Sequence, residues 1–98
     1  MIEDLIKIIR INKNKDNKKS YTSFLINGGL NKCIGKMQEE FDEFKVALNK
    51  NENEIHEAAD LIYHFLVTLE AANIKFEDVL IELKKRTKES GISEKKNR

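Results

Sequence analysis

The chain has 98 residues, a formal net charge of +1, 40% hydrophobic residues and 36% charged residues, which predicts one folded domain over residues 1–98 rather than a disordered chain. The balanced charge argues against a nucleic-acid partner, and the single cysteine, Cys33, excludes an internal disulfide. Because no apolar run approaches the roughly 20 residues that span a bilayer and the N-terminus lacks a basic signal region, we expect no membrane association and a cytoplasmic location.

Helical periodicity runs through most of the chain, which contains no proline and only four glycines. We therefore predict an all-α fold, a bundle of about four to five helices. A first helix is expected at about 2–11, followed by a polar, basic loop at 12–19. Ser20 is expected to cap a short helix that ends at Gly28 and Gly29. Longer helices are predicted at about 30–49, 53–72 and 76–89, with a basic tail at 90–98.

The predicted helix at 30–49 carries an apolar stripe beside an acidic one. Its apolar residues recur at alternating steps of three and four, which predicts one core face. Glu40 and Glu43 fall on a neighbouring stripe in line with Lys36, and Glu39 lies at the far edge of that stripe. The expected core residues of this helix are Ile34, Met37, Phe41, Phe44 and Leu48.

The predicted helix at 53–72 is apolar around most of its circumference, which is typical of a helix buried on more than one side. It nevertheless carries one polar line, formed by Glu57, Asp60, His64 and Thr68 at steps of three and four. Charged side chains are rarely buried unless they are paired or bind a metal. The expected apolar face consists of Ile55, Ala58, Ala59, Ile62, Leu66 and Leu69.

The acidic patterns EExxE at 39–43 and ExxD at 57–60 together predict a metal site. Each pattern places its carboxylates on one side of a helix, and the short connector at 49–53 makes the two helices antiparallel neighbours. Facing carboxylates repel one another unless a cation neutralises them, and oxygen ligands suit Mg²⁺. A solvated acidic surface is the alternative, and for His64 a hydrogen-bonded core position is favoured over metal binding.

The segment GLNKCIGKM at 29–37 superficially matches a phosphate-binding loop. We reject that interpretation because five residues separate its glycines instead of four, Met37 stands where Ser or Thr would bind magnesium, and no strand precedes it. The segment is therefore expected to begin a helix.

Several stretches together resemble the phosphoribosyl-ATP pyrophosphohydrolase family, which belongs to the MazG-like all-α nucleoside triphosphate pyrophosphohydrolases. The acidic patterns resemble the whole superfamily, whereas SYTSFL (20–25), GGLNKCIGKMQEE (28–40) and EAADLIYHFLV (57–67) are similar to the narrower family. DVLIELKKR (78–86) and SGISEKKNR (90–98) resemble its last helix and its C-terminal ending. The resemblance covers roughly residue 20 to the end and, weakly, the first helix. The departures from the family pattern, which bear on pocket shape rather than on metal binding, are Gln38, Phe41, Asp42 and Phe44.

The resemblance implies Mg²⁺-dependent hydrolysis of phosphoribosyl-ATP to phosphoribosyl-AMP and pyrophosphate, the second step of histidine biosynthesis. Water would attack the α-phosphorus directly, and Glu39 would accept its proton, orient it, or act as a further metal ligand. Mg²⁺, or Mn²⁺ in its place, would be held by Glu40, Glu43, Glu57 and Asp60. The basic residues implied for substrate phosphates, for each of which a solvated surface charge is the alternative, are Lys32, Lys36, Arg86, Lys95 and Arg98.

The family fold also implies a homodimer or higher oligomer, with helices of two chains building one bundle. The unusually apolar helix at 53–72 independently favours association, because one chain of this length offers little to cover it. Two other functions stay open at this point. One is a house-cleaning pyrophosphohydrolase of MazG type acting on free nucleoside triphosphates, and the other is a non-catalytic helical dimer that serves as an interaction module.

Overall fold

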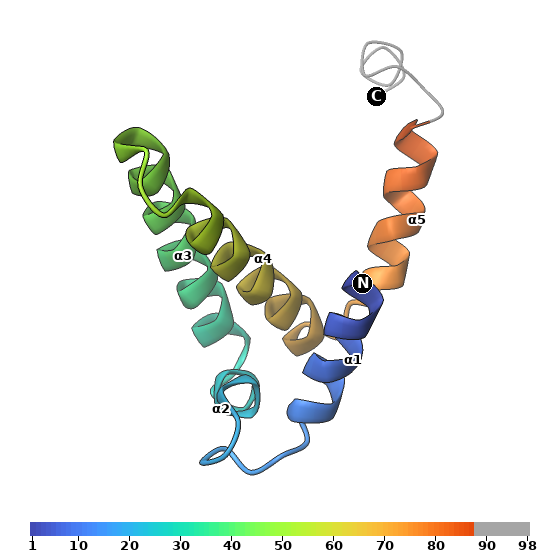
Figure 1. Cartoon of the computed structure of the whole chain (residues 1–98). Helices are drawn as coiled ribbons and strands as arrows, with labels where there is room; N and C mark the ends of the chain where they lie inside the picture. The colour runs from blue at the N-terminus through green and yellow to red at the C-terminus, as the bar shows by residue number, and fades with distance from the viewer. Residues whose placement is uncertain (88–98) are drawn as a thin grey trace.

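The computed structural model describes residues 1–87, which contain five helices and no strand, as the all-α prediction requires. Figure 1 shows a V-shaped molecule in which two antiparallel helices form one arm and the last helix extends along the other. No described helix is long and apolar enough to cross a membrane. The helices are α1 (Ile2–Asn12), α2 (Tyr21–Asn27), α3 (Leu30–Lys50), α4 (Glu54–Ala71) and α5 (Phe76–Thr87).

The helix ends follow the predicted signals closely. Ser20 caps α2, since its side-chain oxygen accepts a hydrogen bond from the backbone N–H of Ser23 at 3.1 Å. Gly29 separates α2 from α3 with a φ of 99°, which L side chains rarely adopt. Asn73, with a φ of 59°, follows the end of α4, and the N–H of Ile74 donates to the carbonyl of Leu69 at 2.9 Å. Residues 30–37 form the first turns of α3, so the rejection of a phosphate-binding loop there is confirmed.

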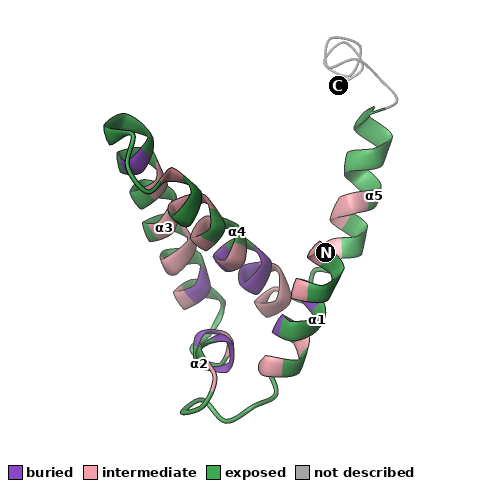
Figure 2. Cartoon of the chain, in the orientation of Figure 1, coloured by how far each residue is buried: buried purple, intermediate pink, exposed green. Residues whose placement is uncertain are grey.

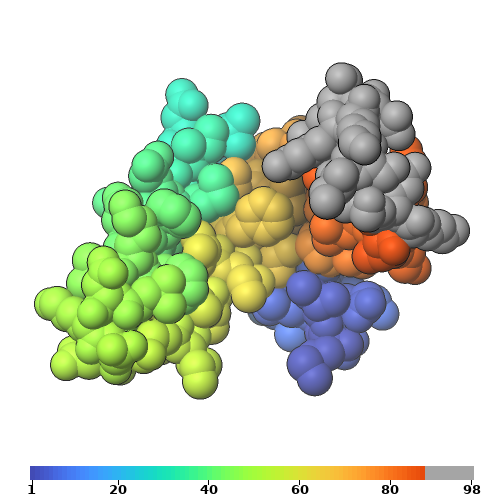
Figure 3. Space-filling view, turned by 90° about the horizontal axis from the view of Figure 1, so that it is seen from above, coloured from blue at the N-terminus to red at the C-terminus, as the bar shows by residue number. Residues whose placement is uncertain are grey.

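The buried core lies where α1 and α2 cover one half of the α3–α4 hairpin. Figure 2 shows most of the buried residues gathered on α2 and on the adjoining turns of α3, α4 and α1. Figure 3 shows α4 in the middle of the molecule, with α3 on one side and α1 and α5 on the other. The cluster of buried core residues consists of Ile6, Ile9, Leu25, Cys33, Leu66 and Val67.

The predicted core stripe of α3 is partly wrong for the single chain, because only Met37 and Phe44 of its five residues are half-buried. Ile34, Phe41 and Leu48 are 41%, 48% and 51% exposed, whereas α3 buries the small side chains of Cys33 and Ala47. The predicted apolar face of α4 is also partly wrong. Only Leu66 of that set is buried, and Ile55 and Ile62 are exposed. The physical reason is that α4 turns its polar line, including the buried His64 and Thr68, toward the interior.

α5 has no buried residue, and ion pairs tie its first turn to the rest of the chain. The guanidinium of Arg10 donates from Nε to Glu70 on α4 at 2.6 Å, and its two other nitrogens donate to Glu77 on α5 at 2.9 and 2.7 Å. This bidentate geometry is the strong form of an arginine–carboxylate pair. Arg10 therefore links α1, α4 and α5 at the point where the second arm begins.

Candidate metal and nucleotide site

The carboxylates of α3 and α4 meet between the two helices. Glu40 and Glu43 from α3 and Glu57 from α4 each place a carboxylate oxygen within 4.8 Å of the others. The i, i+3 spacing on α3 and the tight connector, in which Asn51 and Asn53 both have positive φ, bring these side chains face to face. The expectation that the two acidic patterns meet is confirmed for Glu57 of the second pattern.

Asp60 belongs to a second, overlapping group. His56, Glu57 and Asp60 also bring potential ligand atoms within 4.8 Å of one another, so Glu57 is common to both groups. The Nε2 atom of His56 lies 3.3 Å from Oδ2 of Asp60. His56 was not among the residues predicted for this site, although its i, i+4 spacing to Asp60 is a signal that could have indicated it.

The electrostatics of the first group fit a cation. Burial raises the pKa of Glu40 and of Glu57, and the hydrogen bond and repulsion from Glu43 raise both further. One oxygen of each, Oε2, is buried and has no hydrogen-bond partner within residues 1–87. A buried oxygen without a partner is costly, and a divalent cation would both satisfy it and offset the charge. An oxygen-rich donor set of this kind suits a hard divalent ion.

His64 is a buried neighbour of the site and is not a member of either carboxylate group. It is 6% exposed, and its Nδ1–H donates to the backbone carbonyl of Asp60 at 2.8 Å. With that proton on Nδ1, Nε2 accepts from the hydroxyl of Tyr21 at 3.5 Å. Thr68 donates to the carbonyl of His64 at 2.7 Å. The prediction of a hydrogen-bonded core histidine is confirmed, and its bonds fix the turn of α4 that carries Asp60.

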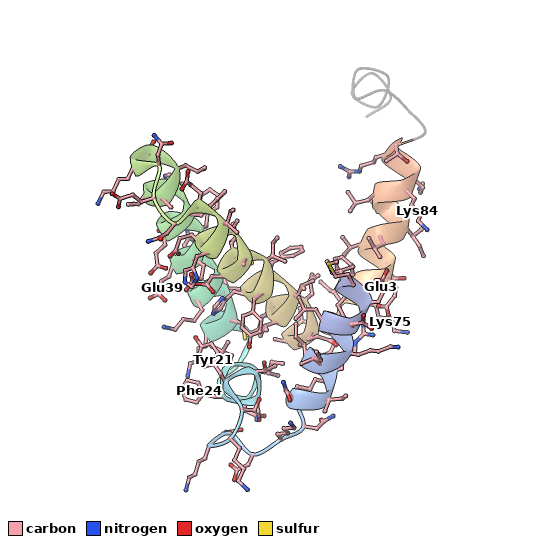
Figure 4. All side chains as sticks on the ribbon, in the orientation of Figure 1. Glu3, Tyr21, Phe24, Glu39, Lys75 and Lys84 are labelled. Carbon is pink, nitrogen blue, oxygen red and sulfur yellow. The ribbon has the colours of Figure 1, made fainter. Side chains whose placement is uncertain are left out.

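Glu39 lies outside the carboxylate groups. Its carboxylate is 61% exposed and forms an ion pair with Nζ of Lys36 at 3.2 Å, which raises the pKa of that lysine. Figure 4 shows Glu39 directed outward from α3, with Tyr21 and Phe24 on the neighbouring side of α2. Lys32, one turn before Lys36, places its Nζ 3.4 Å from the ring centroid of Phe24. Two of the predicted lysines thus line the edge of α3 that leads to the carboxylates.

Of the three remaining predicted basic residues, the structure describes only Arg86, which is not brought to this edge. Arg86 lies on the last turn of α5, in the other arm of the V, where Nε is 3.4 Å from Oε1 of Glu82. Lys95 and Arg98 lie outside the described residues. A role for these three residues in substrate binding stays a prediction.

The family model for phosphoribosyl-ATP pyrophosphohydrolase matches residues 2–87. The chain belongs to this family. The family match includes α1, to which the resemblance noted in the sequence extended only weakly.

Named relatives of the phosphoribosyl-ATP pyrophosphohydrolase family cover nearly the whole chain. A phosphoribosyl-ATP pyrophosphatase of Allorhizobium ampelinum is 41% identical over 99% of this chain and 95% of its own length. One from Bradyrhizobium diazoefficiens is 41% identical over 99% of this chain and 93% of its own length. One from Listeria innocua is 40% identical over 88% of this chain and 84% of its own length. No solved structure matches significantly.

Proposed function

We propose that this protein hydrolyses phosphoribosyl-ATP to phosphoribosyl-AMP and pyrophosphate, with Mg²⁺, or Mn²⁺ in its place, as the cofactor. The observation that carries the proposal is the meeting of Glu40, Glu43 and Glu57 between α3 and α4, with two buried oxygens that lack partners within residues 1–87. Membership of the phosphoribosyl-ATP pyrophosphohydrolase family supports the choice of substrate. Asp60, which shares the second group with Glu57, is the fourth proposed ligand.

The protein's own part in this reaction is to bind, orient and accept a proton. Lys36 and Lys32 supply positive charge along the edge of α3, where triphosphate oxygens would lie. Glu39 is the exposed carboxylate beside Lys36 and would accept a proton from the attacking water. A divalent ion held by the carboxylates would offset the charge of the triphosphate and lower the pKa of a bound water. A cytoplasmic location is part of the same proposal and fits the free thiol of Cys33.

We also propose that two copies of the chain associate. The exposed apolar side chains of α3 and α4 follow the stripes that the sequence assigned to a core. A hollow between these helices is lined by Ile34, Met37, Gln38, Phe41 and Leu61, which include two of the departures from the family pattern. A second copy presenting the same faces would bury them and complete a four-helix arrangement. The large exposed side chains on these faces are Ile34, Phe41, Leu48, Ile55, Ile62 and Phe65.

Alanine substitution of Glu40 or Asp60 tests the ligand assignment. Each substitution is expected to reduce pyrophosphate release from phosphoribosyl-ATP at least 100-fold, while far-ultraviolet circular dichroism shows unchanged helix content. Asp78→Asn, which changes an exposed carboxylate on α5, is the matched control and is expected to keep wild-type turnover. Retained activity in either alanine variant would remove that residue from the metal site.

A substrate panel separates the proposal from a house-cleaning pyrophosphohydrolase. The proposed substrate is expected to have the highest kcat/KM when it is compared with the ordinary and modified nucleoside triphosphates. Hydrolysis of free triphosphates alone would favour the house-cleaning function. No metal-dependent hydrolysis of any member of the panel would favour the non-catalytic helical dimer.

A further inference from the structure

The side chain of Lys32 packs against α2. Its Nζ lies 3.4 Å from the ring centroid of Phe24, a distance at which the ring face attracts the ammonium. Gly28 at the end of α2 leaves room for this path, because a Cβ built on Gly28 would overlap Cδ of Lys32. The φ of Gly28 is −73°, which any residue adopts, so the glycine is needed here for space rather than for backbone freedom.

The ammonium of Lys32 lies against Phe24 but is not neutralised there. Within residues 1–87 it forms no ion pair with a carboxylate, whereas the next lysine along the helix, Lys36, is paired with Glu39. Phe24 holds Lys32 through a ring face that carries no net charge. A positioned cation of this kind keeps its full charge for an incoming anion and has already lost much of its side-chain freedom, which lowers the cost of binding.

Lys32 also lies in register with the carboxylates. Lys32, Lys36 and Glu40 follow one another at i, i+4 and i+8 along the same side of α3. At about 1.5 Å of rise per residue, Lys32 is about 12 Å along the axis from Glu40. A phosphate group of a nucleotide that extends from the carboxylates toward the N-terminal end of α3 would therefore come near Lys32.

We propose that Phe24 and Gly28 are positioning residues for Lys32, whose ammonium binds a phosphate group of the substrate. This inference rests on the proposed function and adds residues of α2 to it. Phosphoribosyl-ATP carries phosphate at two places, the triphosphate chain and the 5′-phosphate of its second ribose. Only the first is shared with ATP, so a comparison of the two substrates distinguishes the sources.

The test compares steady-state kinetics of the full chain carrying Phe24→Leu, Phe24→Tyr, Gly28→Ala or Lys32→Met. Phe24→Leu and Gly28→Ala are expected to raise KM about fivefold or more, with kcat within about twofold of wild type. Phe24→Tyr keeps an aromatic face, so the KM of this variant is expected to stay at the wild-type value. The matched control is Lys45→Met, which removes another lysine of α3 that lies near an aromatic ring. Nζ of Lys45 is 5.9 Å from the ring centroid of Phe41, and Lys45 has no proposed role in binding.

A double substitution separates positioning from a general loss of structure. If Phe24 acts through Lys32, Phe24→Leu raises KM much less in a chain that already carries Lys32→Met. A rise for both phosphoribosyl-ATP and ATP assigns the triphosphate, and a rise for phosphoribosyl-ATP alone assigns the ribose 5′-phosphate. An unchanged KM in Phe24→Leu, or an undiminished effect of that substitution in the Lys32→Met chain, would overturn the proposal.

Binding of pyrophosphate to the metal-free protein distinguishes failure of this inference from failure of the proposed function. The affinity for pyrophosphate, measured by calorimetry, is expected to fall about fivefold in Lys32→Met and Phe24→Leu. In Phe24→Tyr it is expected to equal the wild-type affinity. That pattern in a wild-type protein that does not hydrolyse phosphoribosyl-ATP would support the positioning while overturning the substrate. Equal affinity in wild type, Lys32→Met and Phe24→Leu would overturn the positioning whatever the substrate.

Discussion

Two glutamates illustrate how surroundings decide what a carboxylate contributes. Glu43 faces Glu40 and Glu57 and helps to raise the pKa of both. Glu77 faces Arg10, whose hydrogen bonds lower the pKa of Glu77 to about 2. The cluster around Glu43 destabilises the folded state when no cation is bound, whereas the pair of Glu77 with Arg10 stabilises the folded state at neutral pH. These opposite signs give separate predictions for the two residues.

Glu43→Gln is expected to raise the melting temperature of the metal-free protein at pH 7.5. An acid whose pKa is raised in the folded state destabilises that state as the pH rises through this pKa. The substitution removes the negative charge of Glu43, which repels both Glu40 and Glu57. The same variant is expected to lose about tenfold or more in affinity for Mg²⁺. Thermal unfolding with and without Mg²⁺ measures both effects. A lower metal-free melting temperature together with an undiminished Mg²⁺ shift would contradict the assignment.

Glu77→Gln is expected to remove an acid-sensitive part of the stability. Because the folded pKa of Glu77 is depressed from 4.5 to about 2, its pair with Arg10 stabilises the fold above pH 4.5 and is lost as the pH falls toward 2. Denaturant unfolding at several pH values should show wild type and variant converging over that interval. A constant difference between pH 5 and pH 2 would show that this ion pair is not the cause.

The helices themselves were predictable because their signals are local. Periodic apolar residues, the Ser20 cap and the Gly28–Gly29 break all lie within a few residues of the features they specify. Their ends match the prediction to within one or two residues, and the C-terminal limit predicted for the last helix lies outside the described residues. Local signals of this kind do not require knowledge of what packs against a helix.

Gly29→Ala tests the break between α2 and α3. Its φ of 99° is strained for any residue with a Cβ, so we expect a loss of about 1–3 kcal/mol in the free energy of unfolding. Gly35→Ala is the matched substitution, because Gly35 lies inside α3 with nothing within 4 Å of an added Cβ. There we expect a gain of about 0.5–1 kcal/mol. Equal effects of the two substitutions, measured by urea unfolding, would show that the backbone at Gly29 is not the constraint.

The faces of the helices were harder to assign than their ends. Periodicity correctly grouped Ile34 with Phe41 and Glu57 with Asp60, but it does not say which group meets which neighbour. The large apolar side chains were expected inside, yet the polar line of α4 with its carboxylates faces α3. His56 was missed although its whole group lies on α4 and its i, i+4 spacing to Asp60 is a local signal.

At the scale of the whole molecule, the exposed apolar faces of α3 and α4 predict association. Phe41→Glu and Ile62→Glu each place a charge on one of these faces and are expected to shift the protein from dimer toward monomer. The dissociation constant of the dimer is expected to rise about tenfold or more in each variant. Lys18→Glu, in the loop between α1 and α2, is the charge-changing control. Analytical ultracentrifugation reads the outcome. Unchanged sedimentation of both variants, or a monomeric wild type at micromolar concentration, would remove these faces from any interface between copies.

Hydrolysis of phosphoribosyl-ATP in ¹⁸O-labelled water, with Mg²⁺ and with a chelator, tests the central claim most directly. We expect phosphoribosyl-AMP and pyrophosphate to form only with the metal, and the label to enter the phosphate of phosphoribosyl-AMP, because water attacks the α-phosphorus. Label in pyrophosphate would contradict attack at that atom. Product formed equally in the chelator would contradict the metal role of Glu40, Glu43, Glu57 and Asp60, and no product from this substrate would contradict the proposed function itself.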